Sequence, residues 1–327
     1  MKVAVIGATG MVGTEMLKIL EERDFPVTEL IPLASAKSVG RTVQFRGQAV
    51  PVQEATGDAF SGVRLALFSA GSGTSKELAP KAAAHGALVV DNSSAWRMDP
   101  DVPLCVPEVN LEAAKAPPKG IIANPNCSTI QMVVALGPLH RAATICRIVV
   151  STYQAISGAG ARAVEAFLEQ ERAVVQGDPF DGPQLARSCL MHWSPDEATG
   201  YQEEELKMVH ETRKILGAPS MQVSPTAVRI PVITGHAESI AIDTEKPLSA
   251  AEAREILEGA PGVEVRDDLG SGVYPTPLDV AGTDPVFVGR IRDDIGNPGG
   301  VQLWVVADNL RKGAALNAIQ IAEGLLV

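Results

Sequence analysis

The residues with the clearest capacity for chemistry lie in the stretch Asn124–Thr129, which reads Asn-Pro-Asn-Cys-Ser-Thr. An extended apolar run, Ile121–Ala123, precedes this stretch, and a helix-like run, Ile130–Leu139, follows it. Proline favours extended backbone just before it, and serine or threonine can cap a helix. We therefore expect Cys127 at or beside a helix N-terminus, where the backbone dipole favours the nucleophilic thiolate over the thiol. The alternative is that Cys127 is a small buried hydrophobic residue, as most cysteines are.

A second reactive stretch, Arg229–His236, lies in the C-terminal half of the chain. Its two chemical residues, Arg229 and His236, are too far apart on a straight strand to share one small ligand. Pro231 and Gly235 could bend such a strand and bring the cation and the imidazole toward one site. His236, beside a glycine and between strand segments, is a candidate general acid or base. The histidines that we interpret as ordinary surface or core residues are His85, His140 and His192.

A glycine-rich turn near the N-terminus predicts a nucleotide site. The strand-like run Val3–Ile6 is followed by Gly7, Gly10 and Gly13, a GxxGxxG spacing, and then by a helical pattern. In such turns the first glycine permits the tight turn, the second lets the backbone approach a pyrophosphate, and the third lets the helix pack on the strand. The pyrophosphate would lie on the N–H groups of residues Thr9–Val12. A structural turn without a ligand is the alternative.

The end of the second strand, Glu29–Ala34, indicates which nucleotide this is. NAD sites usually place a carboxylate there to accept from the ribose 2′-OH. Here the loop from Ser35 to Arg41 carries hydroxyls and cations, among them Lys37 and Ser38, and no carboxylate. These side chains suit a 2′-phosphate, so the sequence predicts NADP(H). A solvated loop is the alternative.

The remaining N-terminal pattern completes a doubly wound parallel sheet, a Rossmann-type α/β unit. Strands are expected at Leu65–Phe68 and Leu88–Asp91, with a helix at Thr74–His85 between them. The loop Asp91–Arg97 follows the carboxyl end of a strand, where open parallel sheets bind their ligands. Arg97 is a candidate anion clamp; the alternative is a surface arginine lying over a tryptophan face.

Past Cys127 the pattern favours an α+β unit, a mixed or antiparallel sheet with helices on one face. We expect its strands at Arg147–Gln154, Met221–Arg229, Ser239–Thr244, Val286–Asp293 and Val301–Ala307. We expect its helices at Ala161–Val175, Glu203–Leu216 and Ala250–Gly259, with a loop excursion over 177–200. Most charges on helix Glu203–Leu216 are interpreted as a solvated face. A final helix, Leu310–Leu325, is expected to return to the first domain.

Length and composition bound the class of protein. A chain of 327 residues exceeds one ordinary core, so we expect two domains: 1–126 with 309–327, and 127–308. The net charge of −11 and the absence of basic runs make nucleic acid and anionic membranes poor partners. The four cysteines show no metal-ligand spacing and no dense disulfide pattern, which favours a reducing cytoplasm. We find no signal peptide and no apolar segment long enough to span a membrane. Buried packing is the default expectation for Cys105, Cys146 and Cys189.

Seven motifs in order resemble the aspartate-β-semialdehyde dehydrogenase family along nearly the whole chain. They are Gly7–Gly13, Asp91–Arg97, Asn124–Thr129, Tyr153–Gly160, Glu204–Lys207, Arg229–His236 and Asp308–Ala314. The resemblance implies a Rossmann NADP-binding domain, a glyceraldehyde-3-phosphate-dehydrogenase-like catalytic and dimerisation domain, and a homodimer. It implies the NADPH-dependent reduction of L-aspartyl 4-phosphate to L-aspartate 4-semialdehyde and phosphate. That step feeds the biosynthesis of lysine, diaminopimelate, threonine and methionine.

The resemblance also implies roles for individual residues. Cys127 would form an acyl-thioester, Gln154 would orient the substrate, and His236 would be the acid/base. Arg229 would bind the substrate carboxylate and Glu204 its amino group. Phosphate contacts are implied at Arg97 and Lys207, and a further substrate contact at Asn126. NADP contacts are implied at Gly7, Thr9, Gly10, Met11, Val12, Ser35, Lys37, Ser38, Ser157, Gly158 and Asn309. Lys37 departs from the arginine common in this family, and a lysine cannot make a bidentate phosphate contact.

Other functions remain open from the sequence. An N-acetylglutamyl-phosphate reductase shares the glycine spacing and a Cys/His pair, although Glu204 would have no use beside an acylated amine. A non-catalytic NADP-binding homologue would have no use for Cys127, Gln154, Arg229 and His236 together. A cysteine hydrolase would need the Cys/His pair but neither the glycine turn nor the 2′-phosphate loop.

Overall fold

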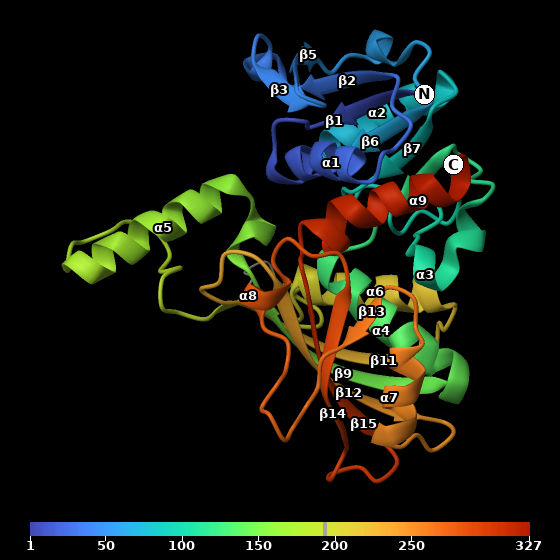
Figure 1. Cartoon of the computed structure of the whole chain (residues 1–327), viewed down its shortest axis with the longest axis vertical. Helices are drawn as coiled ribbons and strands as arrows, with labels where there is room; N and C mark the ends of the chain where they lie inside the picture. Colours follow the sequence, from blue (N-terminus) through green and yellow to red (C-terminus); the bar gives the residue numbers. More distant parts are fainter. Residues whose placement is uncertain (192–194) are drawn as a thin grey trace. The chain divides into compact units, whose positions relative to one another are not determined.

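The computed structural model describes residues 1–191 and 195–327, which fold as two compact units. The first comprises Met1–Asn126 and Ala314–Val327, and the second comprises Cys127–Gly313 (Figure 1). The C-terminal segment thus rejoins the first unit at Ala314 rather than at residue 309. The reason is local: Asn309 Oδ1 accepts from the N–H of Gly235, and the N–H of Gly313 donates to the carbonyl of Asp308, all within the second unit.

The first unit is built on a six-stranded sheet in which every pairing is parallel. Its strand order is β5-β2-β1-β6-β7-β8. The strands are β1 (Lys2–Ile6), β2 (Glu29–Ala34), β5 (Gln53–Glu54), β6 (Leu65–Phe68), β7 (Leu88–Asp91) and β8 (Ile121–Ala123). The inner strands read as continuous apolar runs because both faces of a parallel sheet are covered. The predicted doubly wound sheet is confirmed.

Helices cover this sheet, and the last of them is supplied by the C-terminus. They are α1 (Met11–Glu22), α2 (Ser72–Ala84), the short α3 (Pro107–Asn110) and α9 (Leu316–Leu326). Met16 of α1 and Ile319 of α9 belong to one fully buried apolar cluster. Arg23, just after α1, donates two hydrogen bonds to the carboxylate of Glu323 in α9. The expected return of the final helix is confirmed, although its first turn, Arg311–Ala315, is a π-helix of the second unit's end.

A hairpin and several short turns complete the first unit and were not anticipated. The hairpin pairs β3 (Thr42–Phe45) with β4 (Gln48–Pro51), and single turns η1 (Ala36–Ser38), η2 (Gly57–Phe60) and η3 (Leu111–Ala114) connect the longer elements. Such short elements carry too few residues for a periodic signal. Their absence from the prediction follows from their length.

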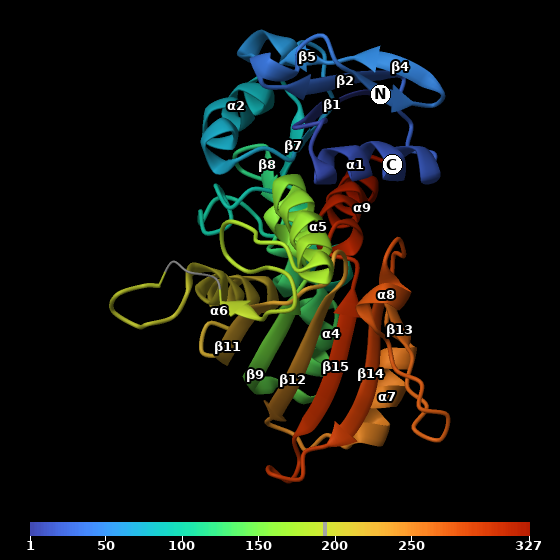
Figure 2. The ribbon, with the colours of Figure 1, turned by 90° about the vertical axis from the view of Figure 1, so that its left-hand side faces the viewer.

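The second unit is built on a seven-stranded mixed sheet of order β10-β11-β9-β12-β15-β14-β13. The strands are β9 (Ile145–Gln154), β10 (Leu190–Met191), β11 (Gln222–Arg229), β12 (His236–Thr244), β13 (Val263–Val265), β14 (Val286–Asp293) and β15 (Val301–Ala307). Figure 2 shows α4 (Cys127–Ala143) and α7 (Ala250–Glu258) on one side of this sheet, and α6 (Glu203–Leu216) packs on β11 and α4. The other helices are α5 (Ala161–Gln176), α8 (Pro277–Val280) and the turn η4 (Ile156–Ala159). The mixed sheet with helices on one face is confirmed.

The central strand β9 gathers the reactive residues at one end of the sheet. It pairs in parallel with β11 on one side and antiparallel with β12 on the other. Arg229, the last residue of β11, pairs with Gln154, the last residue of β9. His236 is the first residue of β12. The expected strand end at Arg229 is confirmed, whereas the next strand starts at His236 rather than at Ser239. The segment with Pro231 and Gly235 connects these two strands, which lie on either side of β9.

The loop expected over 177–200 is only partly a loop. It contains the short strand β10, whose Leu190 pairs with Arg229. His192, interpreted above as an ordinary histidine, lies outside the described residues. Among the helices of the described ranges, none is long and apolar enough to cross a membrane.

Candidate active site

The centre of the candidate site is a contact between a thiol sulfur and an imidazole. Cys127 is the first residue of α4, as the sequence predicts, and its Sγ lies 3.3 Å from Nε2 of His236. His236 is completely buried, while Cys127 is half-buried. The helix dipole and the ring N–H both favour negative charge on this sulfur. The alternative of an inert core cysteine does not fit this contact.

The tautomer of His236 follows from its second contact. The backbone N–H of Ala155 donates to Nδ1 at 3.0 Å. Nδ1 therefore acts as an acceptor, and a neutral ring must carry its proton on Nε2. That proton faces Cys127 Sγ. A second proton, on Nδ1, would be repelled by the Ala155 N–H, so the ring stays neutral. Neutral His236 is therefore suited to donate a hydrogen bond from Nε2 to a thiolate at Cys127.

Gln154 and Arg229 are fixed beside this pair. Gln154, nearly fully buried at the end of β9, donates from Nε2 to Ser128 Oγ at 2.8 Å. Arg229 donates from Nη1 to the carbonyl oxygen of Ala155 at 2.5 Å. The two polar groups of the Ala155 region thus hold His236 and Arg229 on either side of the end of β9. The structure brings the predicted cation and imidazole together.

The absence of a side chain at Gly158 allows Arg229 and His236 to lie close to its backbone. A Cβ at this position would lie 2.9 Å from Arg229 Nη1 and 3.3 Å from both Cε1 and Nε2 of His236. Any side chain at residue 158 would therefore displace the two groups. Gly313 plays a similar part at the sulfur, since its Cβ would lie 3.1 Å from Cys127 Cβ.

Three charged side chains, of which Glu204 and Lys207 are half-buried, form ion pairs in the first two turns of α6. Lys207 Nζ lies 3.3 Å from Glu204 Oε2 and 3.1 Å from Glu203 Oε1. Burial by itself lowers the pKa of Lys207, but the two carboxylates outweigh it and the net shift is upward. Burial also lowers the pKa of Arg229, opposed by the charges of Cys127 and Glu204. Glu204 and Arg229 therefore share one electrostatic environment with the sulfur, and Glu204 is more than a solvated surface charge.

Arg97 and Asn126 belong to the first unit. Arg97 is 8% exposed and donates from Nε to the carbonyl of Asn124 and from Nη2 to the carbonyl of Asn92, both at 3.0 Å. The interpretation of Arg97 as a surface arginine is therefore wrong. Asn317 of α9 donates to Asn124 Oδ1 at 2.7 Å, which fixes the strand end that leads to buried Asn126.

The residues predicted for a cofactor in the first unit line one pocket at the carboxyl ends of β1, β2 and β6. Its volume is about 390 Å³, and the predicted residues that line it are Gly7, Thr9, Gly10, Ser35 and Ser38. A Cβ at Gly7 would lie 2.4 Å from the carbonyl oxygen of Ser69, so the turn depends on glycine there. Met11 and Val12 form the first turn of α1 behind Gly10, and exposed Lys37 lies in η1 beside Ser38.

The cofactor residues predicted in the second unit form a separate hydrogen-bonded group. Asn309 Nδ2 donates to Ser157 Oγ at 2.9 Å, and Asn309 Oδ1 accepts from Gly235 N–H at 2.9 Å. Gly158 follows directly and contacts His236 and Arg229 as described. Ser157, Gly158 and Asn309 thus lie around the Cys127–His236 pair.

His140 and the cysteines other than Cys127 lie outside this site. His140 Nδ1 accepts from Ile145 N–H at 3.0 Å and is structural, as expected. Cys105 is buried as expected, but Cys146 and Cys189 are exposed. Cys146 lies on an outward position of β9, where its Sγ donates to the carbonyl of Asp243. Within the described ranges no cluster of His, Cys, Asp and Glu could hold a metal ion.

Comparisons with known proteins show the family of the chain. The family model described as "Semialdehyde dehydrogenase, NAD binding domain" matches residues 2–116, and that described as "Semialdehyde dehydrogenase, dimerisation domain" matches residues 136–312. An aspartate-semialdehyde dehydrogenase of Aquifex aeolicus is 54% identical over 99% of this chain and 98% of its own length. The chain belongs to the aspartate-semialdehyde dehydrogenase family.

Solved structures of this family share the fold. The structure of aspartate semialdehyde dehydrogenase II from Vibrio cholerae complexed with ASA has a TM-score of 0.95 and 47% identity, and the match covers 98% of this chain and 97% of that one. The enzyme from Candida albicans, solved with NADP, has a TM-score of 0.75 and 25% identity over 98% of this chain and 97% of that one. This family consists of oxidoreductases with the two-domain α/β fold described above.

Sequence reasoning missed four contributors to the site. The N–H and C=O groups around Ala155 are backbone and give no sequence signal. Ser128, interpreted only as a helix cap, binds Gln154. Gln131 and Glu238 lie beneath the pair, and strand alternation could have found Glu238, since it is in phase with His236.

Proposed function

We propose that the chain is an aspartate-semialdehyde dehydrogenase that reduces L-aspartyl 4-phosphate with NADPH through an acyl-thioester on Cys127. The observation that carries the proposal is the 3.3 Å contact between Cys127 Sγ and His236 Nε2 at a helix N-terminus. The family membership and the nearby Arg229 and Glu204 support the choice of an amino-acid substrate.

The first step is attack by the Cys127 thiolate on the acyl-phosphate carbon. A C–S bond forms, and the bond between the acyl carbon and the bridging oxygen breaks. Phosphate leaves with that oxygen and takes up a proton from water. Backbone N–H groups at the start of α4 stabilise the tetrahedral oxyanion, at about 3–4 kcal/mol for each well-placed donor. The thioester splits one difficult reduction into two easier steps.

The second step releases the aldehyde. NADPH, when bound, supplies the hydride that the thioester carbon accepts. The C–S bond then breaks and the electron pair returns to sulfur, where the Nε2–H of His236 and the α4 dipole stabilise the thiolate. In this geometry His236 lowers the energy of the sulfur anion in both steps. To donate a proton, His236 would first have to be doubly protonated. The second proton would lie on Nδ1, and the hydrogen bond from the Ala155 N–H would be lost.

The substrate contacts follow from charge and shape. Arg229 is suited to the α-carboxylate because its planar fork can donate two parallel hydrogen bonds. Glu204, near Arg229, is suited to the ammonium group. Lys207 and Arg97 supply cations for the phosphate, and Asn126 a further contact next to the nucleophile. Gln154, held by Ser128, orients the acyl group.

The pocket of the first unit fits a dinucleotide, and we assign NADP(H) to it. A Cβ at Gly13 would lie 2.1 Å from the carbonyl oxygen of Gly7, so only glycine lets α1 approach the turn this closely. The resulting helix N-terminus at Gly10–Val12 is a ready anion site. Lys37 and Ser38 offer a cation and a hydroxyl for the 2′-phosphate. Ser157, Gly158 and Asn309 would contact the nicotinamide end.

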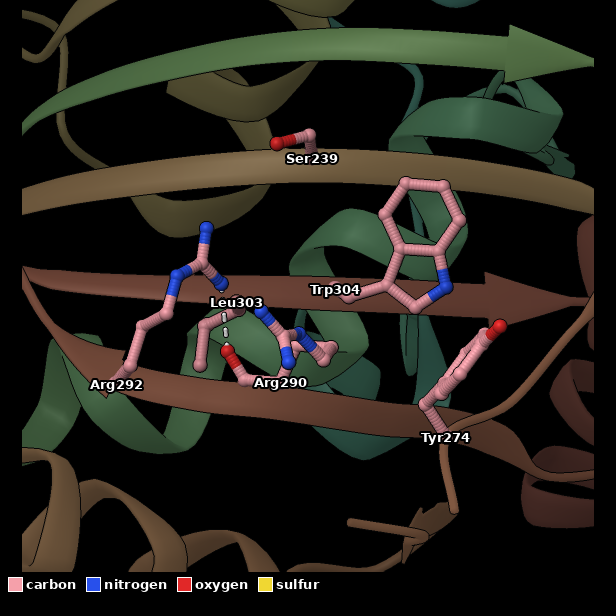
Figure 3. A pocket seen from close by; sticks show the side chains of 6 residues that line it. All are labelled: Ser239, Tyr274, Arg290, Arg292, Leu303 and Trp304. Carbon is pink, nitrogen blue, oxygen red and sulfur yellow. Dashed lines mark hydrogen bonds between the residues drawn. The ribbon is translucent and has the colours of Figure 1, made fainter. Parts of the chain in front are cut away.

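We propose that the first unit is the NADP-binding domain and that the second is the catalytic and dimerisation domain of a homodimer. Side chains on the sheet face away from α4, such as Tyr153, Ser239 and Trp304, are only half-buried. A pocket of about 320 Å³ lies on this face (Figure 3), lined by Ser239, Tyr274, Arg290, Arg292, Leu303 and Trp304. None of these is a residue of the Cys127 site. A second copy would cover this surface of aromatic and arginine side chains, types that are enriched at protein interfaces.

In metabolism this reaction would feed lysine, diaminopimelate, threonine and methionine biosynthesis. The test is the reverse reaction: aspartate semialdehyde, phosphate and NADP should yield NADPH, followed by absorbance. Omission of phosphate should stop steady turnover. Absence of NADPH formation, or equal turnover with N-acetylglutamate semialdehyde, would overturn the proposal.

A further inference from the structure

A group of buried polar side chains lies directly beneath the Cys127–His236 pair. Gln131 is one helical turn after Cys127 on α4, and Glu238 is two residues after His236 on the same face of β12. Thr152 of β9 pairs with Glu238 across the sheet. The group therefore sits between α4 and the sheet, in phase with both reactive residues.

One hydrogen bond in this group ties the two reactive elements together. Gln131 Nε2 donates to the main-chain carbonyl of His236 at 3.4 Å. A carbonyl can only accept, so this contact fixes which end of the Gln131 amide faces His236. The bond joins α4 to β12 one turn below the 3.3 Å contact of sulfur and imidazole. A shift of Gln131 would therefore move the main chain of His236 and change the distance between the sulfur and the imidazole.

Several atoms of this group have no partner within the described ranges. They are both carboxyl oxygens of Glu238, Oε1 of Gln131 and Oγ1 of Thr152. Glu238 is completely buried. An ionised carboxylate in such a place would carry a heavy desolvation cost, whereas a protonated one brings a donor to a group rich in acceptors.

The charges around Glu238 do not favour its ionisation. Burial raises the pKa of Glu238 well above the usual range, opposed only by the side chain of Gln131, which faces it. The ionisable groups in phase with it are His236, two residues before it on β12, and Cys127, one helical turn before Gln131 on α4. Arg147 of β9 is exposed and pairs with Asp243, and Val305 of β15 pairs with Glu238 in the sheet. His140 and Arg141 lie in the last turn of α4.

We propose that Glu238 is a positioning residue: as a neutral carboxylic acid it donates to the Oε1 of Gln131 that lacks a partner, and so keeps Gln131 Nε2 on the main-chain carbonyl of His236, which sets the sulfur–imidazole contact. This inference rests on the proposed function, because it assigns a role in that reaction. Glu238 is buried and touches no substrate. Its loss should therefore lower kcat and leave KM unchanged.

The protonation of Glu238 is tested without any activity measurement. The infrared difference between wild type and Glu238→Gln at about neutral pH should contain the C=O stretch of a protonated carboxyl. The band should persist in Cys127→Ser, which shows that it does not depend on the thiolate. A difference spectrum showing only carboxylate bands would overturn the proposal, whatever the kinetics.

The positioning role is tested by three substitutions. Glu238→Ala should lower kcat about 10- to 100-fold with KM unchanged, because small misplacements of reacting groups are costly. It should also move the pH midpoint of Cys127 alkylation upward, since the thiolate loses its aligned Nε2–H. Glu238→Gln, a neutral isostere, should restore both values.

The matched control is Ile242→Ala, which opens a cavity on the same face of β12 farther from the pair; Ile242 is 1% exposed. It should lower the melting temperature and leave both kcat and the alkylation midpoint unchanged. Equal losses in Glu238→Gln and Glu238→Ala, or an equal kcat loss in Ile242→Ala, would overturn the positioning role. Failure of the wild type to reduce its substrate would instead contradict the proposed function and leave the infrared result standing.

Discussion

The two units build their sites by opposite means. The pocket of the first unit is shaped by missing side chains, since a Cβ at Gly7 or Gly13 would collide with backbone oxygens. The site of the second unit is shaped by polar side chains, buried His236 and half-buried Cys127 and Arg229, each fixed by a partner. A cofactor that many enzymes share can be bound by a common backbone turn, whereas the chemistry of one substrate requires a specific set of charged side chains.

This difference predicts different consequences of mutation. Changes in the first unit should act on cofactor affinity and on stability, because backbone is displaced. Changes in the second unit should act on turnover, because a fixed charge or nucleophile is lost.

Cys127→Ser should have the largest effect. Serine lacks the thiolate, so reduction of aspartyl phosphate should fall by about 10⁴-fold or more. NADPH binding, followed by quenching of tryptophan fluorescence, should be unchanged because the pocket of the first unit is intact. Activity that survives this change would refute the covalent route.

Arg229→Lys should come next. Lysine keeps the charge but cannot make a bidentate contact with the substrate carboxylate, so kcat/KM should fall on the order of 100-fold, about 2.7 kcal/mol. Steady-state kinetics in the reverse direction provide the measurement. A variant within a few-fold of wild type would show that the carboxylate is bound elsewhere.

Gly13→Ala should damage the first unit through its backbone. The added Cβ meets the Gly7 carbonyl at 2.1 Å, so the turn must move, at a cost of about 1–3 kcal/mol in stability and with weaker NADPH binding. Gly73→Ala in α2 is the control, because nothing lies within 4 Å of its Cβ. Thermal unfolding should distinguish the two, and equal melting temperatures would contradict the steric argument.

Lys37→Ala should reduce the preference for NADPH over NADH by about tenfold, since one charge contact with the 2′-phosphate is lost. Lys37→Arg should preserve or increase the preference, because arginine adds a bidentate contact. The ratio of kcat/KM for the two cofactors is the measure. Equal wild-type turnover with NADH and NADPH would remove the basis for the NADP assignment.

Lys207→Met should have the smallest effect, a loss of folding stability that depends on pH. Its folded-state pKa lies above the ordinary value of 10.5, so its pairing with Glu203 and Glu204 stabilises the fold fully below that value. The stabilisation is lost as pH rises through the higher folded-state pKa. The difference in unfolding free energy between wild type and Lys207→Met should be about 0.2–1 kcal/mol and constant from about pH 7 to 9. A difference that already declines in that range would contradict the upward shift.

The first unit was largely predictable because its signals are local. The runs Val3–Ile6 and Leu65–Phe68 are continuously apolar, and the glycine turn lies between a strand and a helix in sequence. The position of Cys127 at a helix start was predictable for the same reason. The short hairpin at Thr42–Pro51 lacked such a signal.

The geometry of the second site depends on long-range pairing, which no local pattern encodes. Arg229 and His236 meet because β11 and β12 both pair with β9, so the connection between them crosses the end of that strand. The tautomer of His236 depends on the backbone of Ala155. The resemblance to the family indicated the reactive residues. Neither the resemblance nor the hydrophobic pattern of the sequence indicated a role for the buried Glu238.

The most direct test of the central claim is to look for the acyl group on sulfur. When the enzyme is incubated with aspartate semialdehyde and NADP without phosphate, the aldehyde should form a C–S bond to Cys127. Transfer of its hydride to NADP should then leave an aspartyl thioester that nothing removes quickly. Peptide mass spectrometry should then find the aspartyl adduct on Cys127, and added phosphate should discharge it. NADPH formation with no adduct, or an adduct on another residue, would contradict the account.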